Sequence, residues 1–197
     1  MEADRNGGYN GGIPAKKLKA TSRITRAEFN CLCEYAGRST TPFILEVGTL
    51  RGGTAKLLAE KFPDRWVWTV DIAAYAPDEL SQIPNLARVL ADSTKFCSML
   101  EKTGLCPSFA LVFLDASHLY KGVKSDFQCW SRFVAEDGYI ALHDARVIDG
   151  TAVTMDGTTW DGDREGPRRV VSEAIADGWH QVAVADSVVV LSKERSS

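Results

Sequence analysis

The feature that most constrains the fold is a repeated unit along the chain. Each unit is a short apolar run that ends in or beside an acidic residue, and it is followed by a segment with helical spacing. Five such runs occur, namely FILEVG (43–48), WVWTVDI (66–72), ARVLADS (87–93), FALVFLD (109–115) and YIALHD (139–144). Strands that alternate with helices predict a mostly parallel sheet with helices on both faces. The chain is therefore expected to be a doubly wound α/β protein.

The segments around these runs predict the remaining elements. Thr25 followed by Glu28 is the pattern of a capping box, so a helix is expected to start there. The predicted helices cover 25–37, 54–62, 94–104, 120–138 and 166–178, with a short helix or turn at 77–83. Residues 179–193 predict two strands joined by a tight turn, which would add an antiparallel hairpin and bring the sheet to seven strands.

The length of 197 residues predicts a single folded domain, expected over 21–197. Residues 1–20 are rich in Gly, Asn and Lys and predict a flexible tail. The Gly- and Asp-rich stretch 145–165 shows no element. A segment of that length in a compact domain is usually functional or disordered.

Composition excludes several classes of protein. A net charge of −3 gives no basic surface for nucleic acid or an anionic membrane. No apolar run approaches the ~20 residues of a membrane span, and the N-terminus lacks the apolar core of a signal peptide. Five cysteines in mostly apolar patterns are expected to be buried, reduced thiols. A cytoplasmic location is therefore predicted.

Acidic residues at the ends of the predicted strands point to a shared binding site. Ligands of open α/β sheets bind beyond the carboxyl ends of the strands. Five acids would lie along that edge, namely Glu46, Asp71, Asp92, Asp115 and Asp144. A buried acid is costly without a partner, so five at equivalent positions predict a common ligand.

The first turn, EVGTLRGGT (46–54), narrows the ligand. It lacks both the G-x-G-x-x-G pattern of dinucleotide sites and the G-x-x-x-x-G-K-[ST] pattern of phosphate loops. Glu46 would repel a pyrophosphate but would suit an amino group. Asp71 lies 23 residues after Gly48, close to the spacing of an acid that binds ribose hydroxyls. A nicotinamide-dependent oxidoreductase is therefore the less favoured reading.

From about residue 43 to 193, the chain resembles class I S-adenosylmethionine-dependent methyltransferases. LEVGTLRGGT looks like motif I of that family, VDI (70–72) like its ribose motif, and ADS (91–93) like its adenine-side motif. FLDASHLYKG (113–122) and DGYIALHDA (137–145) resemble the branch of small O-methyltransferases that act on catechols, caffeoyl-CoA, sugars and antibiotics. The resemblance implies a Rossmann-like seven-stranded sheet with a C-terminal antiparallel hairpin.

The resemblance also implies how the chain holds its cofactor, S-adenosylmethionine. Glu46, Gly48 and Thr54 would hold the methionine end, and Asp71 would bind the ribose. Asp92 and Ser93 would flank the adenine. The remaining residues expected at the cofactor are Thr49, Gly52, Gly53 and Ile72, with Asp115 between cofactor and metal.

Asp115, His143 and Asp144 occupy the positions of the metal ligands in that branch, where the catechol enzymes have Asp-Asn at the last pair. Two carboxylates suit Mg²⁺, and the added histidine makes Mn²⁺ or another transition metal more plausible. Alternation along a strand would turn His143 and Asp144 to opposite faces unless the strand has already ended. The alternative is that His143 packs beneath the site and Asp144 caps a turn.

His118 lies three residues after Asp115, where catechol-type enzymes carry a lysine base. By resemblance His118 is the expected general base, and a histidine can take a proton near neutral pH. The alternative is that His118 caps a helix or only contacts substrate. The expected partner is a small molecule with a hydroxyl acceptor, and a homodimer is one option. Competing hypotheses are a metal-independent methyltransferase and a non-catalytic cofactor-binding protein.

Overall fold

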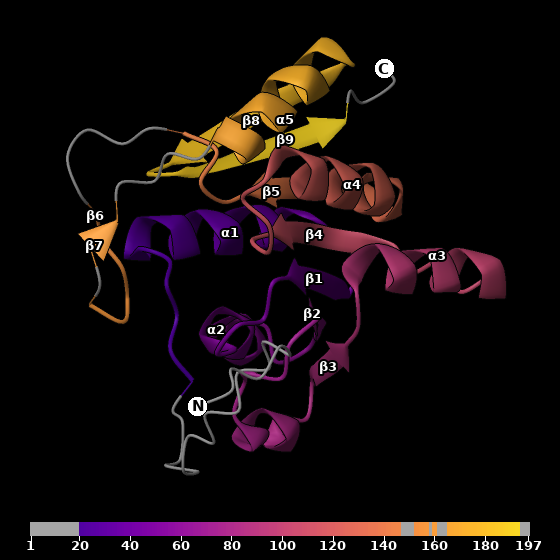
Figure 1. The fold of residues 1–197 in the computed structure, drawn as a ribbon. Helices are drawn as coiled ribbons and strands as arrows, with labels where there is room; N and C mark the ends of the chain where they lie inside the picture. Colours follow the sequence, from indigo (N-terminus) through magenta and orange to yellow (C-terminus); the bar gives the residue numbers. More distant parts are fainter. Residues whose placement is uncertain (1–19, 147–151, 158, 161–164, 194–197) are drawn as a thin grey trace, which may run out of the picture.

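The computed structural model describes residues 20–146, 152–157, 159–160 and 165–193 (Figure 1). The expected tail, 1–20, lies outside these residues except for Ala20. A seven-stranded sheet has the order β3-β2-β1-β4-β5-β9-β8. Its strands are β1 (Phe43–Val47), β2 (Trp66–Asp71), β3 (Leu86–Leu90), β4 (Phe109–Leu114), β5 (Val134–Leu142), β8 (Trp179–Ala185) and β9 (Val188–Lys193). The first five are parallel and the last two form an antiparallel hairpin, as predicted.

Helices cover both faces of this sheet (Figure 1). They are α1 (Arg26–Arg38), α2 (Gly53–Lys61), α3 (Ser93–Thr103), α4 (Tyr120–Trp130) and α5 (Glu165–Ala176), with short 3₁₀ turns η1 (Asp78–Gln82) and η2 (Ser131–Phe133). Alternate residues of the central strands enter two separate cores. Ile44 packs with α1 and α2, while Leu45 packs with α3, α4 and α5. Both faces of the central strands are thus buried, which explains their continuous apolar runs.

The capping box at the start of α1 is present. The Thr25 side chain accepts a hydrogen bond from the Glu28 N–H, and a Glu28 carboxylate oxygen accepts one from the Thr25 N–H. These bonds satisfy two backbone donors that have no partner within the helix.

The predicted helix 120–138 is too long. α4 ends at Trp130, and β5 begins at Val134. Gly138 does not close a helix but lies within β5, where the pairing with β4 shifts register. A Cβ at this position would lie 2.5 Å from the Phe109 carbonyl oxygen, so the glycine permits a close approach of two strands.

The stretch 145–165 contains one small element that the sequence did not predict. β6 (Ala152–Val153) and β7 (Thr159–Trp160) form an antiparallel pair. The Met155 N–H donates to the Ile24 carbonyl, which joins this pair to the segment before α1. Residues 147–151, 158 and 161–164 lie outside the described part of the chain.

The prediction of five reduced thiols is wrong for one pair. Cys97 of α3 and Cys129 of α4 form a disulfide, because both side chains enter the same core between these helices. The three other cysteines are free, but Cys106 is exposed and Cys31 and Cys33 are half-buried, so the expected burial is also wrong for these three. Within the described ranges, no helix has the length and apolar character needed to cross a membrane.

Candidate functional site

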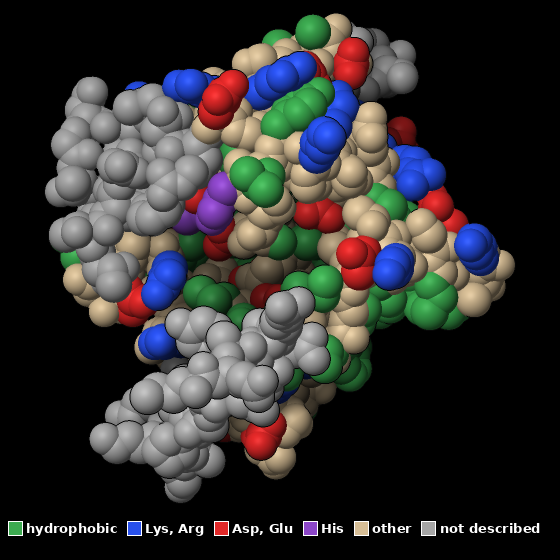
Figure 2. Space-filling view, in the orientation of Figure 1, with side chains coloured by type: hydrophobic (Ala, Val, Ile, Leu, Met, Phe, Trp, Pro, Cys, Tyr) green, Lys and Arg blue, Asp and Glu red, His purple; other side chains and the backbone are tan. Residues whose placement is uncertain are grey.

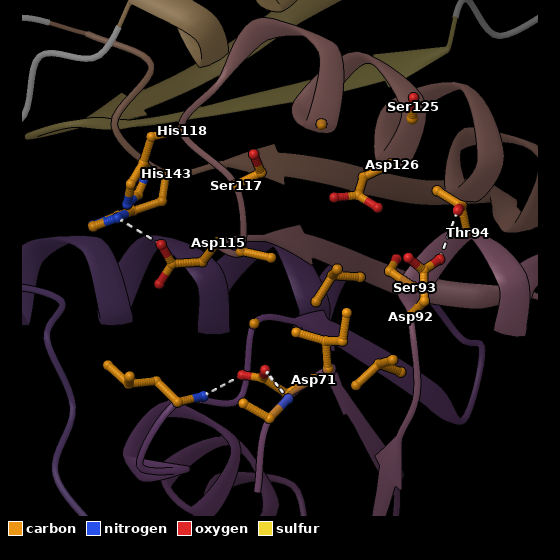
Figure 3. Close-up of a pocket in the computed structure, with 18 of the residues that line it drawn as sticks. Asp71, Asp92, Ser93, Thr94, Asp115, Ser117, His118, Ser125, Asp126 and His143 are labelled. Carbon is orange, nitrogen blue, oxygen red and sulfur yellow. Dashed lines mark hydrogen bonds and ion pairs between the residues drawn. The ribbon is translucent and has the colours of Figure 1, made fainter. Parts of the chain in front are cut away.

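A cavity of about 1090 Å³ opens at the carboxyl ends of β1, β2 and β4, and α4 forms one of its walls (Figures 2 and 3). Nine predicted site residues line it: Gly48, Asp71, Ile72, Asp92, Ser93, Asp115, His118, His143 and Asp144. Five others do not: Glu46, Thr49, Gly52, Gly53 and Thr54. The structure therefore brings together most of the predicted site.

The glycines of the first turn allow close packing of the chain. Gly48 has φ 109°, and a Cβ there would lie 2.3 Å from the Asp115 carbonyl oxygen. Gly52 is the left-handed residue that precedes α2. A Cβ at Gly53 would lie 2.1 Å from the backbone of Thr21. Because these positions carry no side chain, the end of β1 can approach the end of β4, and the start of α2 can approach the backbone of Thr21.

Asp71, at the end of β2, is held by two backbone N–H groups. Its Oδ2 accepts from Leu50 N at 2.8 Å, and its Oδ1 accepts from Ala73 N at 2.9 Å (Figure 3). The carboxylate lines the cavity in this fixed orientation. Each of its oxygens has a further lone pair, so the group can still accept from hydroxyl groups of a ligand.

Glu46 lies beneath the first turn and is 1 % exposed. Its Oε2 accepts from Thr69 Oγ1 at 2.5 Å, and Thr69 Oγ1 lies 2.7 Å from Thr49 Oγ1. Burial raises the pKa of Glu46 to about 8; the Thr69 hydrogen bond opposes this rise and the charges of two nearby acids add to it. Through Thr69, Glu46 and Thr49 are thus linked by hydrogen bonds beneath the first turn (46–54). Thr54 makes a similar bond, 2.8 Å from the Ser22 hydroxyl.

Asp92 lies at the end of the cavity away from His118 and His143, and it caps the start of α3 (Figure 3). Its Oδ1 accepts from Lys95 N at 3.0 Å and from Thr94 Oγ1 at 2.8 Å (Figure 3). These hydrogen bonds lower the pKa of Asp92. Ser93 accepts from the Trp130 indole N–H at 2.7 Å. The expected adenine-side pair is therefore tied to both α3 and α4.

Asp126 also lines this end of the cavity and was not predicted. It comes from α4 and is 7 % exposed, and burial raises its pKa. Val123, Asp126, Phe127 and Trp130 recur at helical spacing, so an acid on that otherwise apolar face is the signal that could have revealed it.

Acidic and histidine side chains gather where β4 and β5 end. This histidine–acid cluster consists of Asp115, His118, His143 and Asp144. His143 Nδ1 lies 3.0 Å from Asp115 Oδ1 and 3.2 Å from Asp144 Oδ1. β5 ends at Leu142, and Asp144 has φ 54° in a turn. The strand has therefore ended before these residues, and His143 and Asp144 turn toward the same point despite their adjacency.

His118 joins this cluster from the loop after β4. Its Nδ1 lies 3.1 Å from Asp144 Oδ2, and its side chain is 42 % exposed at the cavity rim (Figure 3). No side chain caps the start of α4. The expectation that His118 could serve as a helix cap is therefore wrong, and the ring faces a carboxylate at the cavity.

The cluster has the donors and the spacing of a divalent cation site. One ligand atom from each of Asp115, His143 and Asp144 lies within 4.8 Å of the others. Adjacent ligands of an octahedral cation with bonds of ~2.1 Å are separated by about 3.0 Å, close to the two distances from His143 Nδ1. Neither ring nitrogen of His143 has a hydrogen bond of good geometry among the described residues. The residues present therefore fit such an ion.

When no cation is bound, the carboxylates around His143 favour the protonated form of its ring. Burial lowers the pKa of His143, but the carboxylates of Asp115, Glu28 and Asp144 outweigh it and hold this pKa well above its usual value. An imidazolium and a divalent cation would both neutralise the same carboxylates.

A family profile described as "Methyltransferase domain" matches residues 45–145, just over half of the chain. This range contains the cavity-lining ends of β1 through β5 and both histidines of the cluster. No curated protein sequence matches the chain.

Solved structures of low sequence identity share the fold. The MycE methyltransferase from the mycinamycin biosynthetic pathway, in complex with Mg, SAH and mycinamycin VI, is 16 % identical over 85 % of this chain, with a TM-score of 0.57. This chain spans about half of that one (48 %). The calicheamicin methyltransferase CalS11 is 12 % identical over 84 % of this chain and 77 % of its own, with a TM-score of 0.57.

A Staphylococcus aureus protein provisionally assigned as a caffeoyl-CoA O-methyltransferase is matched over more of its length. It is 14 % identical over 88 % of this chain and 86 % of its own, with a TM-score of 0.64.

Proposed function

Because this chain belongs to the family of methyltransferase domains, we propose that it transfers a methyl group from S-adenosylmethionine to a hydroxyl group of a small molecule. The observation that carries the proposal is the placement of His118 against Asp144 at the rim of the cavity, beside His143 and Asp115. A base, an acid that orients it and a candidate cation site there suit the activation of a hydroxyl group.

The deeper part of the cavity is proposed to hold the cofactor. Asp71 would accept from the ribose hydroxyls, and Asp92, Ser93 and Asp126 would surround the adenine. A typical ligand pocket has a volume of ~300–1,000 Å³. The observed cavity, at about 1090 Å³, leaves room for an acceptor beside the cofactor.

His118 is proposed to take the proton of the acceptor. His118 Nδ1 faces Asp144 Oδ2 at 3.1 Å, so Nε2 is the ring nitrogen proposed to meet the acceptor hydroxyl. The acceptor oxygen forms a bond to the methyl carbon while the carbon–sulfur bond of the sulfonium breaks. The sulfur keeps that electron pair, and the proton passes to His118 Nε2.

Asp115, His143 and Asp144 are proposed to hold Mg²⁺ or Mn²⁺. A bound cation would lower the pKa of the acceptor hydroxyl and orient its oxygen. The mixed set of two carboxylates and one imidazole favours Mn²⁺ over Mg²⁺, which prefers oxygen ligands. The presence of Mg in the MycE complex supports a cation in a protein of this fold.

A small molecule is the proposed acceptor class. The names of the structural neighbours support it, since they include enzymes of mycinamycin and calicheamicin biosynthesis. The cytoplasmic location and the homodimer expected from the sequence stay predictions.

Transfer of a labelled methyl group from S-adenosylmethionine to a panel of phenols, sugars and macrolides tests the proposal. Each acceptor is assayed with Mn²⁺ and with EDTA. Product formed only with Mn²⁺ supports the metal-assisted reaction, and product in both conditions supports the metal-independent enzyme. Cofactor binding without product from any acceptor would contradict the proposed transfer and favour a non-catalytic cofactor-binding protein.

A further inference from the structure

Glu28 is a buried acid that the proposed reaction does not use. It lies on α1, 115 residues before His143 in the sequence, and is 1 % exposed. The sequence identifies it only as the second half of a capping box. That role occupies Oε2, which accepts from Thr25 N at 2.7 Å. The capping box alone does not explain why the carboxylate is fully enclosed.

The remaining contacts of Glu28 lead toward the cavity. Its Oε2 also lies 3.4 Å from His143 Nε2. Its Oε1 accepts from Ser187 N at 3.0 Å and from Ser187 Oγ at 2.6 Å. Ser187 is fully buried in the turn between β8 and β9. One carboxylate therefore joins α1, the end of β5 and the C-terminal hairpin.

Ser187 in turn holds the backbone beside His143. Its carbonyl oxygen accepts from Ala145 N at 2.9 Å, and its Oγ lies 3.4 Å from Asp144 N. Asp144 has φ 54°, a left-handed conformation that is uncommon outside glycine but that aspartate adopts more readily than most residues. This conformation turns Asp144 toward the same point as His143.

We propose that Glu28, acting with Ser187, is a positioning residue for the candidate cation site. Glu28 Oε2 lies 3.4 Å from His143 Nε2, so with a cation bound it would attract the Nε2–H and leave the lone pair of Nδ1 directed toward Asp115 and Asp144. Through Ser187 it also fixes the Asp144 turn. A metal-bound histidine usually donates its other ring N–H to a carboxylate or carbonyl, which fixes its tautomer and ring orientation. The part concerning a cation rests on the proposed function.

The test compares Glu28→Gln with the matched control Thr25→Ala. The control removes the other half of the capping box and leaves the contact between Glu28 and His143 in place. Three quantities are measured for each: calorimetric affinity for Mn²⁺, the ¹⁵N shifts of the His143 ring in metal-free protein, and the melting temperature.

Glu28→Gln is expected to weaken Mn²⁺ binding by about 10–100-fold and to shift the His143 Nε2 resonance. Thr25→Ala is expected to lower the melting temperature but to leave both the Mn²⁺ affinity and the ring shifts as in wild type. Unchanged His143 shifts and Mn²⁺ affinity in a folded Glu28→Gln protein would overturn the proposal. Thr25→Ala also removes the hydrogen bond from Thr25 Oγ1 to Asp186 Oδ2 in the β8–β9 turn. Equal weakening of Mn²⁺ binding in Thr25→Ala would overturn the proposal too, because the effect would then come from the helix start and this turn rather than from the Glu28 carboxylate.

Two further outcomes remain informative. If the wild-type protein binds no Mn²⁺, the cation part of the proposed function fails, while the His143 shifts of metal-free Glu28→Gln still decide whether Glu28 orients the ring. If Glu28→Gln does not fold, Ser187→Ala takes its place. That variant keeps the Glu28 carboxylate but removes its Oγ partner, and it is expected to weaken Mn²⁺ binding. Unchanged binding in Ser187→Ala would contradict the role of the pair.

Discussion

The pKa values of two buried glutamates, Glu46 and Glu28, are shifted in opposite directions. The pKa of Glu46 is raised to about 8, since its burial is met only by a neutral Thr69 hydroxyl. Burial also acts to raise the pKa of Glu28, but His143, Ser187 and the Thr25 N–H lower it to about 2. The neighbours, rather than the depth of burial, decide the charge of each group.

Glu46→Gln is predicted to change how stability depends on pH. The folded protein holds the Glu46 proton more tightly than the unfolded chain does. The contribution of this group to the free energy of unfolding is therefore complete below pH 4.5 and is lost as the pH rises toward about 8. Glutamine keeps the acceptor for Thr69 and cannot ionise.

Thermal unfolding at pH 5 and pH 8 measures this difference. Relative to wild type, Glu46→Gln should gain on the order of 2–4 kcal/mol between these two pH values. The exposed Glu60→Gln is the control and should show no such gain. A pH profile of Glu46→Gln that parallels the wild-type profile would contradict a protonated Glu46.

His118→Ala is predicted to remove the proposed base while the cofactor still binds. Loss of a general base typically costs about 10²–10⁴-fold in rate. The expected result is a fall in kcat of that size, with the affinity for S-adenosylhomocysteine unchanged. His180→Ala, on β8, is the control and should retain wild-type turnover. A His118→Ala enzyme with wild-type kcat would show that His118 only contacts substrate.

Among single residues, the sequence predicted the acids and histidines at strand ends better than their supports. Asp115 and Asp144 could be grouped because parallel strands end at one edge, and the family resemblance added His143 to them. Glu28 was predicted only as part of a capping box, and the apolar helical face that carries Asp126 marks that acid as unusual without showing which strand it meets. Their cavity-directed positions depend on which helix face meets which strand.

At the scale of elements, periodicity predicted where most helices and strands begin. The error at α4 arose because the segment after Trp130 continues to read as an apolar helical pattern and ends in a glycine. Val134 and the following residues instead pair with β4. Backbone hydrogen bonds to a neighbouring strand outweighed local helical preference there.

The first turn makes a prediction at this scale. Gly48→Ala would place a Cβ 2.3 Å from the Asp115 carbonyl oxygen and would require φ 109° of alanine. The expected result is destabilisation by more than about 2 kcal/mol, together with weaker cofactor binding, because β1 and β4 must separate.

The control for this substitution is Gly37→Ala in α1. No atom lies within 4 Å of a Cβ there, and alanine favours a helix by up to about 1 kcal/mol. Its melting temperature should match or exceed that of wild type. Denaturant unfolding of both variants makes the comparison, and equal stabilities would refute the close contact at Gly48.

At the scale of the whole molecule, the strand order places the cavity beside the two central strands. β1 and β4 are neighbours, and the chain proceeds outward from them in opposite directions, which is where ligands of open α/β sheets bind. The strand arrangement and the position of the site at this edge were predicted from the alternating strands and helices and from the family resemblance.

The sequence did not predict which residues line the side of the cavity that is proposed for the acceptor. Arg23 and Thr154 line the cavity from two segments that precede α1 and follow β5. These segments carry no periodic pattern, and their position depends on long-range contacts such as that between Met155 and Ile24. If the proposed function holds, these two segments are expected to contact the acceptor.

Calorimetric titration of S-adenosylhomocysteine into the protein tests the cofactor site most directly. Wild type is predicted to bind one equivalent in the presence of EDTA. Asp71→Asn should weaken binding by about 10–100-fold, since a charged acceptor for the ribose is lost, while exposed Asp78→Asn should bind as wild type does. Absence of binding to the wild-type protein, or equal affinity of Asp71→Asn, would contradict the proposed cofactor site.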